Sequence, residues 1–184
     1  MQNLIKGTFA TDSGTLGVWN PSGFPMVTDC ETWDSELCED EDMLRHVRAG
    51  DFVPVGIDHG ADGAFGVVVR RGTDKNAVIL TARERAYLLT ESQPFLFVTS
   101  GLLCLSGLEH VCSSPGSEVG VAEIEAGRYA VKIFLIAWDQ EPGMSKADGS
   151  PKKKALPDFV VHISPETGVE SYRQSVYALD PAAA

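Results

Sequence analysis

Short apolar segments separated by turn-forming residues constrain the fold of this chain more than any other feature. The segments are rich in Val, Ile, Phe, Tyr and Thr, which favour β-strands. Gly, Pro, Asn and Asp separate them, in runs such as NPSG, GTDKN and SSPGS. We expect strands over residues 15–20, 52–57, 64–70, 77–82, 95–105, 119–125, 128–138 and 158–164. Many short strands at fairly regular spacing predict an all-β fold, specifically an antiparallel β-sandwich.

The same pattern occurs twice along the chain. TDSGTLGVWN at 11–20 resembles VTSGLLCLSG at 98–107, and VPVGIDHGADGAFGVVVRRG at 53–72 resembles GVAEIEAGRYAVKIFLIAWD at 120–139. This similarity predicts two duplicated halves of about four strands each, because either half alone would leave an apolar face uncovered. Chance similarity between strands rich in Val and Gly is the alternative explanation.

The length of 184 residues and the hydrophobic content of 43% are sufficient for one packed core. We therefore expect a single domain over residues 1–184, with one half at about 1–92 and the other at about 93–180. The first half contains an insertion at about 28–50 that the second half lacks.

The insertion contains a predicted helix, DEDMLRHVRAGD. Its apolar residues recur with helical spacing, acids lie at its start, and basic residues lie near its end, as the helix macrodipole favours. Gly50 occupies the position expected of a left-handed C-terminal residue. Glu41 and Arg45 are spaced as a favourable i,i+4 ion pair.

An acidic block precedes and overlaps this helix. Eight carboxylates and no Lys or Arg occur in the fourteen residues from Asp29 to Asp42, and without them the net charge of −11 would be −3. Such a concentration around an aromatic residue is typical of a surface that recognises a basic protein. The candidate binding residues are Trp33, Glu36, Glu39, Asp40 and Glu41. The alternative is a solvated helix start that binds nothing.

Nucleic acid is disfavoured as a partner, because phosphate contacts require a basic face. A calcium loop of the EF-hand type is disfavoured as well, since counting from Asp29 the sixth position holds Asp34 rather than Gly. The cysteines Cys30, Cys38, Cys104 and Cys112 lack the close spacing of zinc ligands, so we expect free thiols, most of them buried. No metal and no cofactor is therefore predicted.

Catalytic motifs are scarce. Nucleophile elbows, Walker loops and zinc-protease motifs do not occur in the sequence. The four histidines are scattered: His162 is expected to face outward from a half-buried strand, and His110 with Cys112 is a conceivable dyad. We therefore expect a non-enzymatic binding protein, of the inhibitor or immunity type. The competing hypothesis is a carboxylate-based hydrolase or a carbohydrate-binding module with Asp29, Asp34 and Asp58, which predicts convergent carboxylates, at least one with a raised pKa.

The segment 140–158 is expected to be a long loop that joins two antiparallel strands. Its Lys152 to Lys154 would either bind sulfate or phosphate or form a solvated tip. The sequence shows neither a secretory signal pattern nor an apolar run long enough for a membrane span, so we expect a cytoplasmic protein without a membrane partner. The oligomeric state stays open.

Three segments, FATDSGTLGVWNP, ADGAFGVVVRRG and EAGRYAVKIFLIAWD, carry a family resemblance. They resemble a group of uncharacterised bacterial β-rich domains that share a T-D-[ST]-G-[ST]-L opening and a D-G-x-[YF]-x-V strand. The resemblance covers roughly two-thirds of the chain and lies in strands and turns. It implies a β-rich fold and assigns no catalytic residue.

Overall fold

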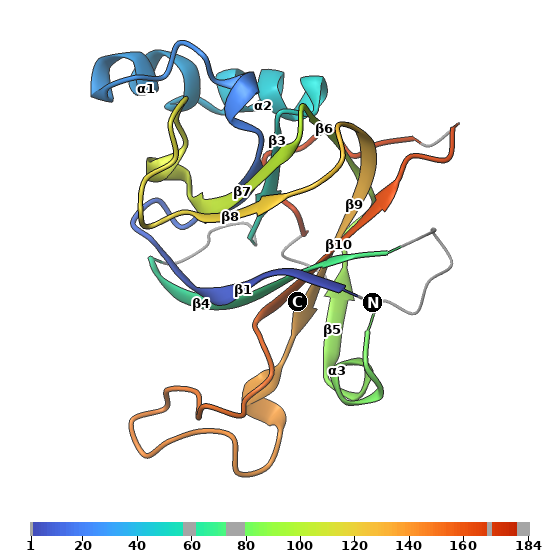
Figure 1. Ribbon diagram of the computed structural model, residues 1–184. Helices are drawn as coiled ribbons and strands as arrows, with labels where there is room; N and C mark the ends of the chain where they lie inside the picture. The colour runs from blue at the N-terminus through green and yellow to red at the C-terminus, as the bar shows by residue number, and fades with distance from the viewer. Residues whose placement is uncertain (1, 57–61, 73–79, 169–170, 180–184) are drawn as a thin grey trace.

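The computed structural model describes residues 2–56, 62–72, 80–168 and 171–179. They form two β-sheets in layers, with two helices over the smaller sheet (Figure 1). The larger sheet has the order β1-β4-β10-β9-β5, with β6 also paired to β9, and the smaller sheet has the order β3-β2-β7-β8. All strand pairs are antiparallel except β4 with β10, which is parallel. The prediction of a mostly antiparallel β-fold is confirmed, whereas the sandwich stays a prediction.

The strands of the larger sheet are β1 (Gln2–Thr11), β4 (Gly63–Arg71), β5 (Leu88–Glu91), β6 (Phe95–Thr99), β9 (Gly127–Ile136) and β10 (Phe159–Pro165). Those of the smaller sheet are β2 (Leu16–Trp19), β3 (Phe52–Val55), β7 (Leu102–Gly107) and β8 (Gly120–Glu123). The helices are α1 (Cys30–Leu37), α2 (Asp40–Ala49) and α3 (Ala82–Ala86), with short 3₁₀ turns η1 (Pro21–Gly23), η2 (Leu108–His110) and η3 (Trp138–Gln140).

Two strand predictions differ from the structure, and two strands were not predicted. The strand expected over 95–105 is two strands, because the chain turns at Gly101, whose φ is 133°, and passes from one sheet to the other. The strand expected over 77–82 lies partly outside the described residues, and its remaining end is the start of α3, where Thr81 caps the helix in a capping box with Glu84. Strands β1 and β5 were not predicted; each lies at an edge of the larger sheet.

The insertion holds two helices rather than the one that was predicted. Helix α2 matches the prediction and ends at Gly50, whose φ is 85° and whose N–H bonds to the carbonyl of His46. A Cβ at this position would lie 2.7 Å from Val98 Cγ2 of β6, so glycine also permits close packing. Asp29 is the N-cap residue of helix α1, and its carboxylate accepts the Thr32 N–H over 2.9 Å.

The main core lies between the two sheets and continues beneath the helices. Side chains alternate along the smaller sheet, so that Val18 and Leu103 face the larger sheet while Trp19 and Cys104 face the helices. Leu37 of α1 and Val47 of α2 belong to the same buried cluster as these residues. The helices are therefore held by packing on the sheet as well as by their local sequence.

A second core covers the outer face of the larger sheet. Leu80, Phe134, Ile136, Leu156 and Val160 form this cluster, with Trp138 packed against it. The predicted outward exposure of His162 is wrong: it lies on this face, but only 3% of its surface is exposed. The segment that follows β9 and the region of α3 cover this face, which explains the burial.

The strand pairings follow the same order in both halves. β1 pairs with β4 and β2 with β3 in the first half, and β6 pairs with β9 and β7 with β8 in the second. Gly14 and Gly101, which correspond in the sequence repeat, both have positive φ. The correspondence stops at β10, which is parallel to β4, whereas β5 is antiparallel to β9. These pairings agree with the predicted duplication, which itself stays a prediction.

Candidate functional site

A groove of about 510 Å³ lies between the start of α1 and the segment that follows β7. We call it the α1 groove. Residues 27–34 line one side, and residues 109–119 line the other. The N–H of Ser113 bonds to the carbonyl of Val27 over 2.9 Å, so the two sides are tied together by the backbone.

The floor of the α1 groove is apolar. Val27 and Val111 are buried, and Val119 lies beside them in the lining. Trp33 is half-buried, and its indole Nε1 donates a hydrogen bond to the carbonyl oxygen of Leu108 over 3.1 Å. Trp33 is therefore fixed in orientation, and it is a wall of a groove rather than an exposed aromatic anchor.

Carboxylates surround this floor. Asp29, Asp34, Glu109 and Glu118 all line the groove. Hydrogen bonds from the backbone and side chain of Thr32 lower the pKa of Asp29, and those from its own backbone N–H and from the Ser117 hydroxyl lower the pKa of Glu118. Both groups are therefore ionised at neutral pH.

Glu109 also has a structural role. Its carboxylate accepts hydrogen bonds from the Thr11 hydroxyl and from the Asp12 N–H, each over 3.2 Å. These bonds hold the turn between β1 and β2 against η2. Asp34, by contrast, is exposed and makes no ion pair with any described residue, so its charge is available to a partner.

The five predicted binding residues lie on α1 and at the start of α2. Of the five, only Trp33 lines the α1 groove. Glu36 accepts a hydrogen bond from Arg45 over 2.9 Å and lies 3.3 Å from His46 Nε2, so it joins the two helices. Glu41 pairs with Arg48 over 3.0 Å, and the predicted pair of Glu41 with Arg45 is not formed. 

Glu39 and Asp40 lie where α2 begins. Glu39 is the N-cap residue but makes no side-chain cap, and Asp40 is in the first turn. Asp40 lines a smaller hollow of about 310 Å³ on the other side of Trp33. Helix caps, first turns and ion pairs therefore account for six of the eight carboxylates of the acidic block, all except Asp34 and Glu39, which agrees with the alternative of a helix start.

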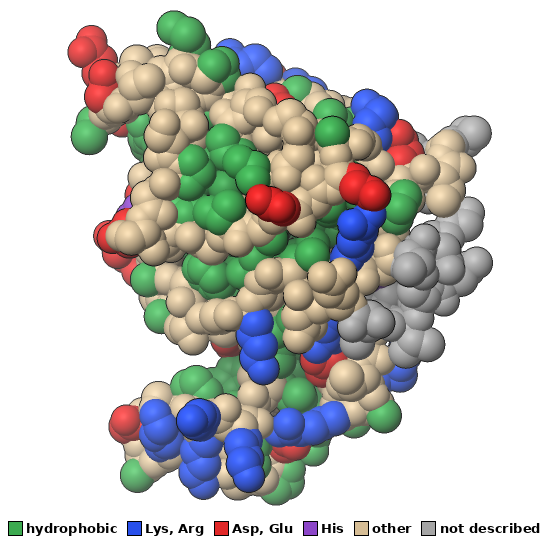
Figure 2. All heavy atoms as spheres, viewed as in Figure 1, with side chains coloured by type: hydrophobic (Ala, Val, Ile, Leu, Met, Phe, Trp, Pro, Cys, Tyr) green, Lys and Arg blue, Asp and Glu red, His purple; other side chains and the backbone are tan. Residues whose placement is uncertain are grey.

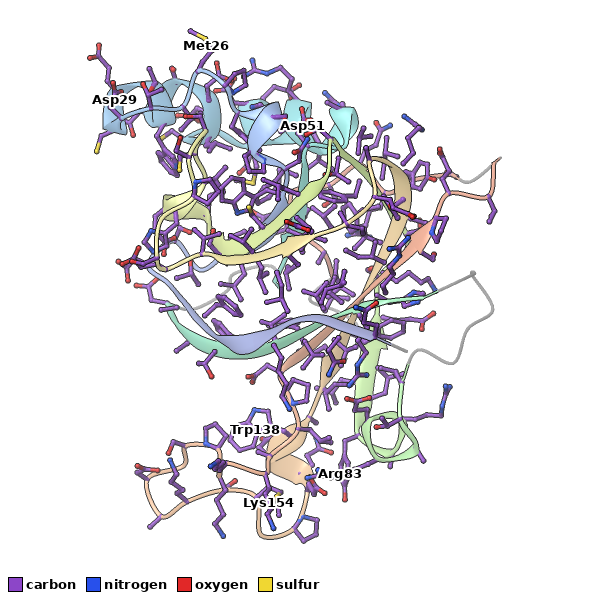
Figure 3. The ribbon with its side chains drawn as sticks, in the orientation of Figure 1. Met26, Asp29, Asp51, Arg83, Trp138 and Lys154 are labelled. Carbon is purple, nitrogen blue, oxygen red and sulfur yellow. The ribbon has the colours of Figure 1, made fainter. Side chains whose placement is uncertain are left out.

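Two charge regions lie at opposite ends of the molecule. Figure 2 shows Lys and Arg side chains gathered over the segment between β9 and β10, while Asp and Glu side chains project at the end that carries α1. Met26 and Asp29 lie at the second end, and Arg83 and Lys154 lie at the first (Figure 3). The segment does join two antiparallel strands, as predicted.

Comparison with known proteins identifies a similar fold. No family model matches the chain, and no curated protein matches it. A solved structure titled "Crocagin biosynthetic gene J" is similar, with a TM-score of 0.58, 15% identity, and coverage of 90% of this chain and 97% of that chain. At this identity the similarity concerns the fold alone.

A second solved structure is less similar. It is titled as ComJ, an inhibitor of the DNA-degrading activity of NucA, from Bacillus subtilis. The TM-score is 0.45 at 8% identity, with coverage of 90% of this chain and 98% of that chain. A score at this level does not establish a common fold.

The hydrolase hypothesis receives little support from the carboxylates. Asp29 and Asp34 do line one groove, but the pKa of Asp29 is lowered rather than raised. Asp58 lies outside the described residues. Burial raises the pKa of Asp158, but Asp158 does not line the α1 groove. Its two carboxylate oxygens accept hydrogen bonds from Gly66 N–H and Trp138 Nε1, each over 2.7 Å.

The remaining candidates for chemistry are the cysteines, including the pair of Cys112 with His110. Cys112 donates to the carbonyl of Ser114 over 3.1 Å, and the structure records no hydrogen bond between Cys112 and His110. The cysteines are free, but only Cys104 is buried, where burial raises its pKa to about 12. Among the described residues, no group of three His, Cys, Asp or Glu side chains could hold a metal ion.

None of the helices within the described ranges is long and apolar enough to cross a membrane.

Proposed function

We propose that this protein is a non-enzymatic binding protein whose α1 groove holds a basic and partly apolar segment of a protein partner. One observation carries the proposal: an apolar floor with a fixed Trp33 is surrounded by carboxylates that are ionised at neutral pH. An inhibitor or immunity-type role is the specific form that we favour.

The chemistry of the groove suits Lys or Arg side chains of a partner. Their aliphatic stems pack on apolar surface while their charged ends stay near carboxylates, and an aromatic face attracts a cation. The volume of about 510 Å³ suits a short segment rather than a folded domain. The overall net charge of −11 would also speed the approach of a basic partner.

The relevant carboxylates differ from those expected from the acidic block. Asp34 and Glu118 are exposed, line the groove from opposite sides, and have no ion pair with a described residue. Glu36 and Glu41 already pair with arginines of α2. Partner recognition should therefore depend on Asp34 and Glu118 more than on Glu36 and Glu41.

Selection of binders from a random-peptide display library tests the proposal. We expect the selected peptides to combine Lys or Arg with an apolar residue. The double variant Asp34→Asn/Glu118→Gln should weaken the best peptide by about tenfold or more, with a stronger effect at low salt. The control Glu39→Gln/Asp40→Asn removes the same charge from the acidic block outside the groove and should change affinity by less than about twofold.

Selection of acidic peptides, or an equal loss of affinity in both double variants, would contradict the proposal. A loss confined to Glu39→Gln/Asp40→Asn would move the recognition surface to the start of α2. Circular dichroism of each variant checks that the fold is unchanged.

A further inference from the structure

Another hollow, of about 600 Å³, lies at the opposite end of the molecule from the α1 groove. It is bounded by the outer face of β1 and β4, by the start of α3, and by residues 153–157. We call it the basic hollow. Its charged lining residues are Lys6, Arg70, Arg83, Lys153, Lys154 and a single carboxylate, Glu84.

An ion pair inside the protein forms the floor of the basic hollow. Arg70 and Glu84 are joined by two hydrogen bonds of 2.7 and 2.6 Å, and their side chains are 8% and 4% exposed. Thr81 N–H donates to the same carboxylate over 2.8 Å. The floor is therefore rigid, and the charge of Glu84 is already matched by Arg70.

A second arginine positions the rim. Arg83 makes two hydrogen bonds to Glu141, of 2.6 and 2.5 Å, and a third to the carbonyl oxygen of Lys154 over 2.8 Å. Figure 3 shows Arg83 and Lys154 close together at this end of the molecule. This contact holds the backbone of Lys154 against α3, so that Lys153 and Lys154 lie along the edge of the hollow.

Three positive charges remain unmatched by any carboxylate in the described part of the chain. Glu84 offsets Arg70 and Glu141 offsets Arg83, whereas Lys6, Lys153 and Lys154 are exposed and form no ion pair within the described ranges. Neutral donors lie near them. Asn3 Oδ1 accepts from Arg70 Nε over 3.2 Å, which directs its amide N–H groups away from Arg70, and Thr81 also lines the hollow.

We propose that the basic hollow binds a small molecule that carries a phosphate group. Three ammonium groups around one concavity match the charge and the several acceptor oxygens of a phosphate ester, and Lys is a common phosphate ligand. The volume lies within the range of small-molecule sites, about 300–1,000 Å³. This site is separate from the α1 groove and does not depend on the function proposed for it.

Titration of the full-length protein with inorganic pyrophosphate, followed by amide chemical shifts, tests the proposal. We expect saturable shifts at residues 81–84 and 153–157, at an ionic strength held at about 0.15 M so that weak surface attraction is screened. The double variant Lys153→Gln/Lys154→Gln should raise the dissociation constant by about tenfold or more. Lys6→Gln should raise it as well, by a smaller factor.

The matched control is Lys146→Gln/Lys152→Gln. These two lysines lie in the same loop but outside the hollow, where they bond to Ser150 Oγ and to the Gly143 carbonyl. The control removes the same charge and should change the dissociation constant by less than about twofold. Equal weakening by both double variants, or shifts that do not saturate, would overturn the proposal in favour of diffuse attraction to the loop.

A parallel titration with citrate tests the chemical class of the ligand. Binding of citrate as tight as that of pyrophosphate would overturn the assignment to phosphate. Clearly weaker binding of citrate supports it, because a site built for phosphate distinguishes oxygen geometry as well as charge.

Discussion

The indole Nε1 of Trp33 lies 3.1 Å from the carbonyl oxygen of Leu108, and this hydrogen bond joins α1 to a segment that is 75 residues away in the chain. The bond sets the width of the α1 groove, since Trp33 belongs to one side and η2 leads into the other. The proposed binding site therefore depends on a contact between two segments that are distant in the sequence.

Replacement of Trp33 by Phe tests this contact. The ring stays, but the Leu108 carbonyl loses its donor, so we expect the free energy of unfolding to fall by about 1 kcal/mol. Urea denaturation followed by circular dichroism measures the change. Trp33→Ala should cost more, because apolar packing is lost as well. Equal stability of wild type and Trp33→Phe would show that the hydrogen bond contributes nothing.

Substitutions of Asp29 separate its capping role from its charge. Asp29→Ala removes the side chain that accepts the Thr32 N–H, and we expect the melting temperature to fall by about 2–4 °C. Asp29→Asn should leave the melting temperature almost unchanged, because Asn caps helices as well as Asp does. The control Asp34→Asn removes an exposed charge without touching a cap. A similar fall in the melting temperature of all three variants would contradict the capping role.

Glu84→Gln tests the ion pair in the floor of the basic hollow. The variant leaves the buried Arg70 without this carboxylate, and we expect a loss of about 3 kcal/mol at neutral pH. Glu91→Gln, which disrupts the exposed pair with Lys132, is the control and should cost less than about 1 kcal/mol. Guanidinium denaturation of both variants provides the comparison.

The effect of Glu84 should depend on pH. Burial raises the pKa of Glu84, but the hydrogen bonds from Arg70 and Thr81 outweigh this and leave it below the ordinary value of 4.5. The stabilisation is therefore fully present above pH 4.5 and is lost as the pH falls through the lower pKa of the folded state. This explanation would be contradicted if the difference in free energy of unfolding between wild type and Glu84→Gln stayed unchanged at the lowest pH.

His162→Leu is expected to stabilise the protein. The Nε2 atom of His162 is buried and has no hydrogen-bond partner among the described residues. Removal of such a group should stabilise the protein by about 1 kcal/mol at neutral pH. Burial, and then the charge of Lys132, lower the pKa of His162 below 6.5; Arg70 is its neighbour on the other side in the sheet. Thermal unfolding at several pH values measures the effect.

The sign of the pH dependence follows from the lowered pKa. Below pH 6.5 the unfolded chain binds a proton at His162 before the folded protein does, so the wild type loses stability as the pH falls. The advantage of His162→Leu should therefore widen below pH 6.5. A constant difference between the two proteins would show that His162 does not contribute to the pH dependence.

Local patterns predicted several elements well. The apolar segments around residues 64–70 and 158–164 became β4 and β10, and the charge polarity of α2 with Gly50 at its end placed that helix correctly. The signal for α1 was present in the capping box of Asp29 and Thr32, but the acids around it were interpreted as a surface. Strand propensity, the charge polarity of a helix and a capping box all depend on residues within a few positions of one another.

The candidate site was predicted only in part. Trp33 was identified, and so were Asp29 and Asp34 under the competing hypothesis, but Glu118 and Val111 were missed because their segment showed only turn formers. In the sequence, the acids Glu36 and Glu41 could not be distinguished from Asp34. In the fold, however, both form ion pairs with arginines of α2. Charge in a sequence does not show which charges are matched in the fold.

The sequence by itself determined the β-rich character of this protein, the end of α2 at Gly50, and the separation of acidic and basic segments along the chain. Backbone propensity, side-chain alternation and helix termination are local effects, and they operate wherever the segment lies. Only the tertiary structure decided the parallel pairing of β10 with β4, the contact of Trp33 with Leu108, and the burial of Arg70 with Glu84. Each of these brings together residues distant enough along the chain that their proximity results from packing the whole core rather than from any local pattern.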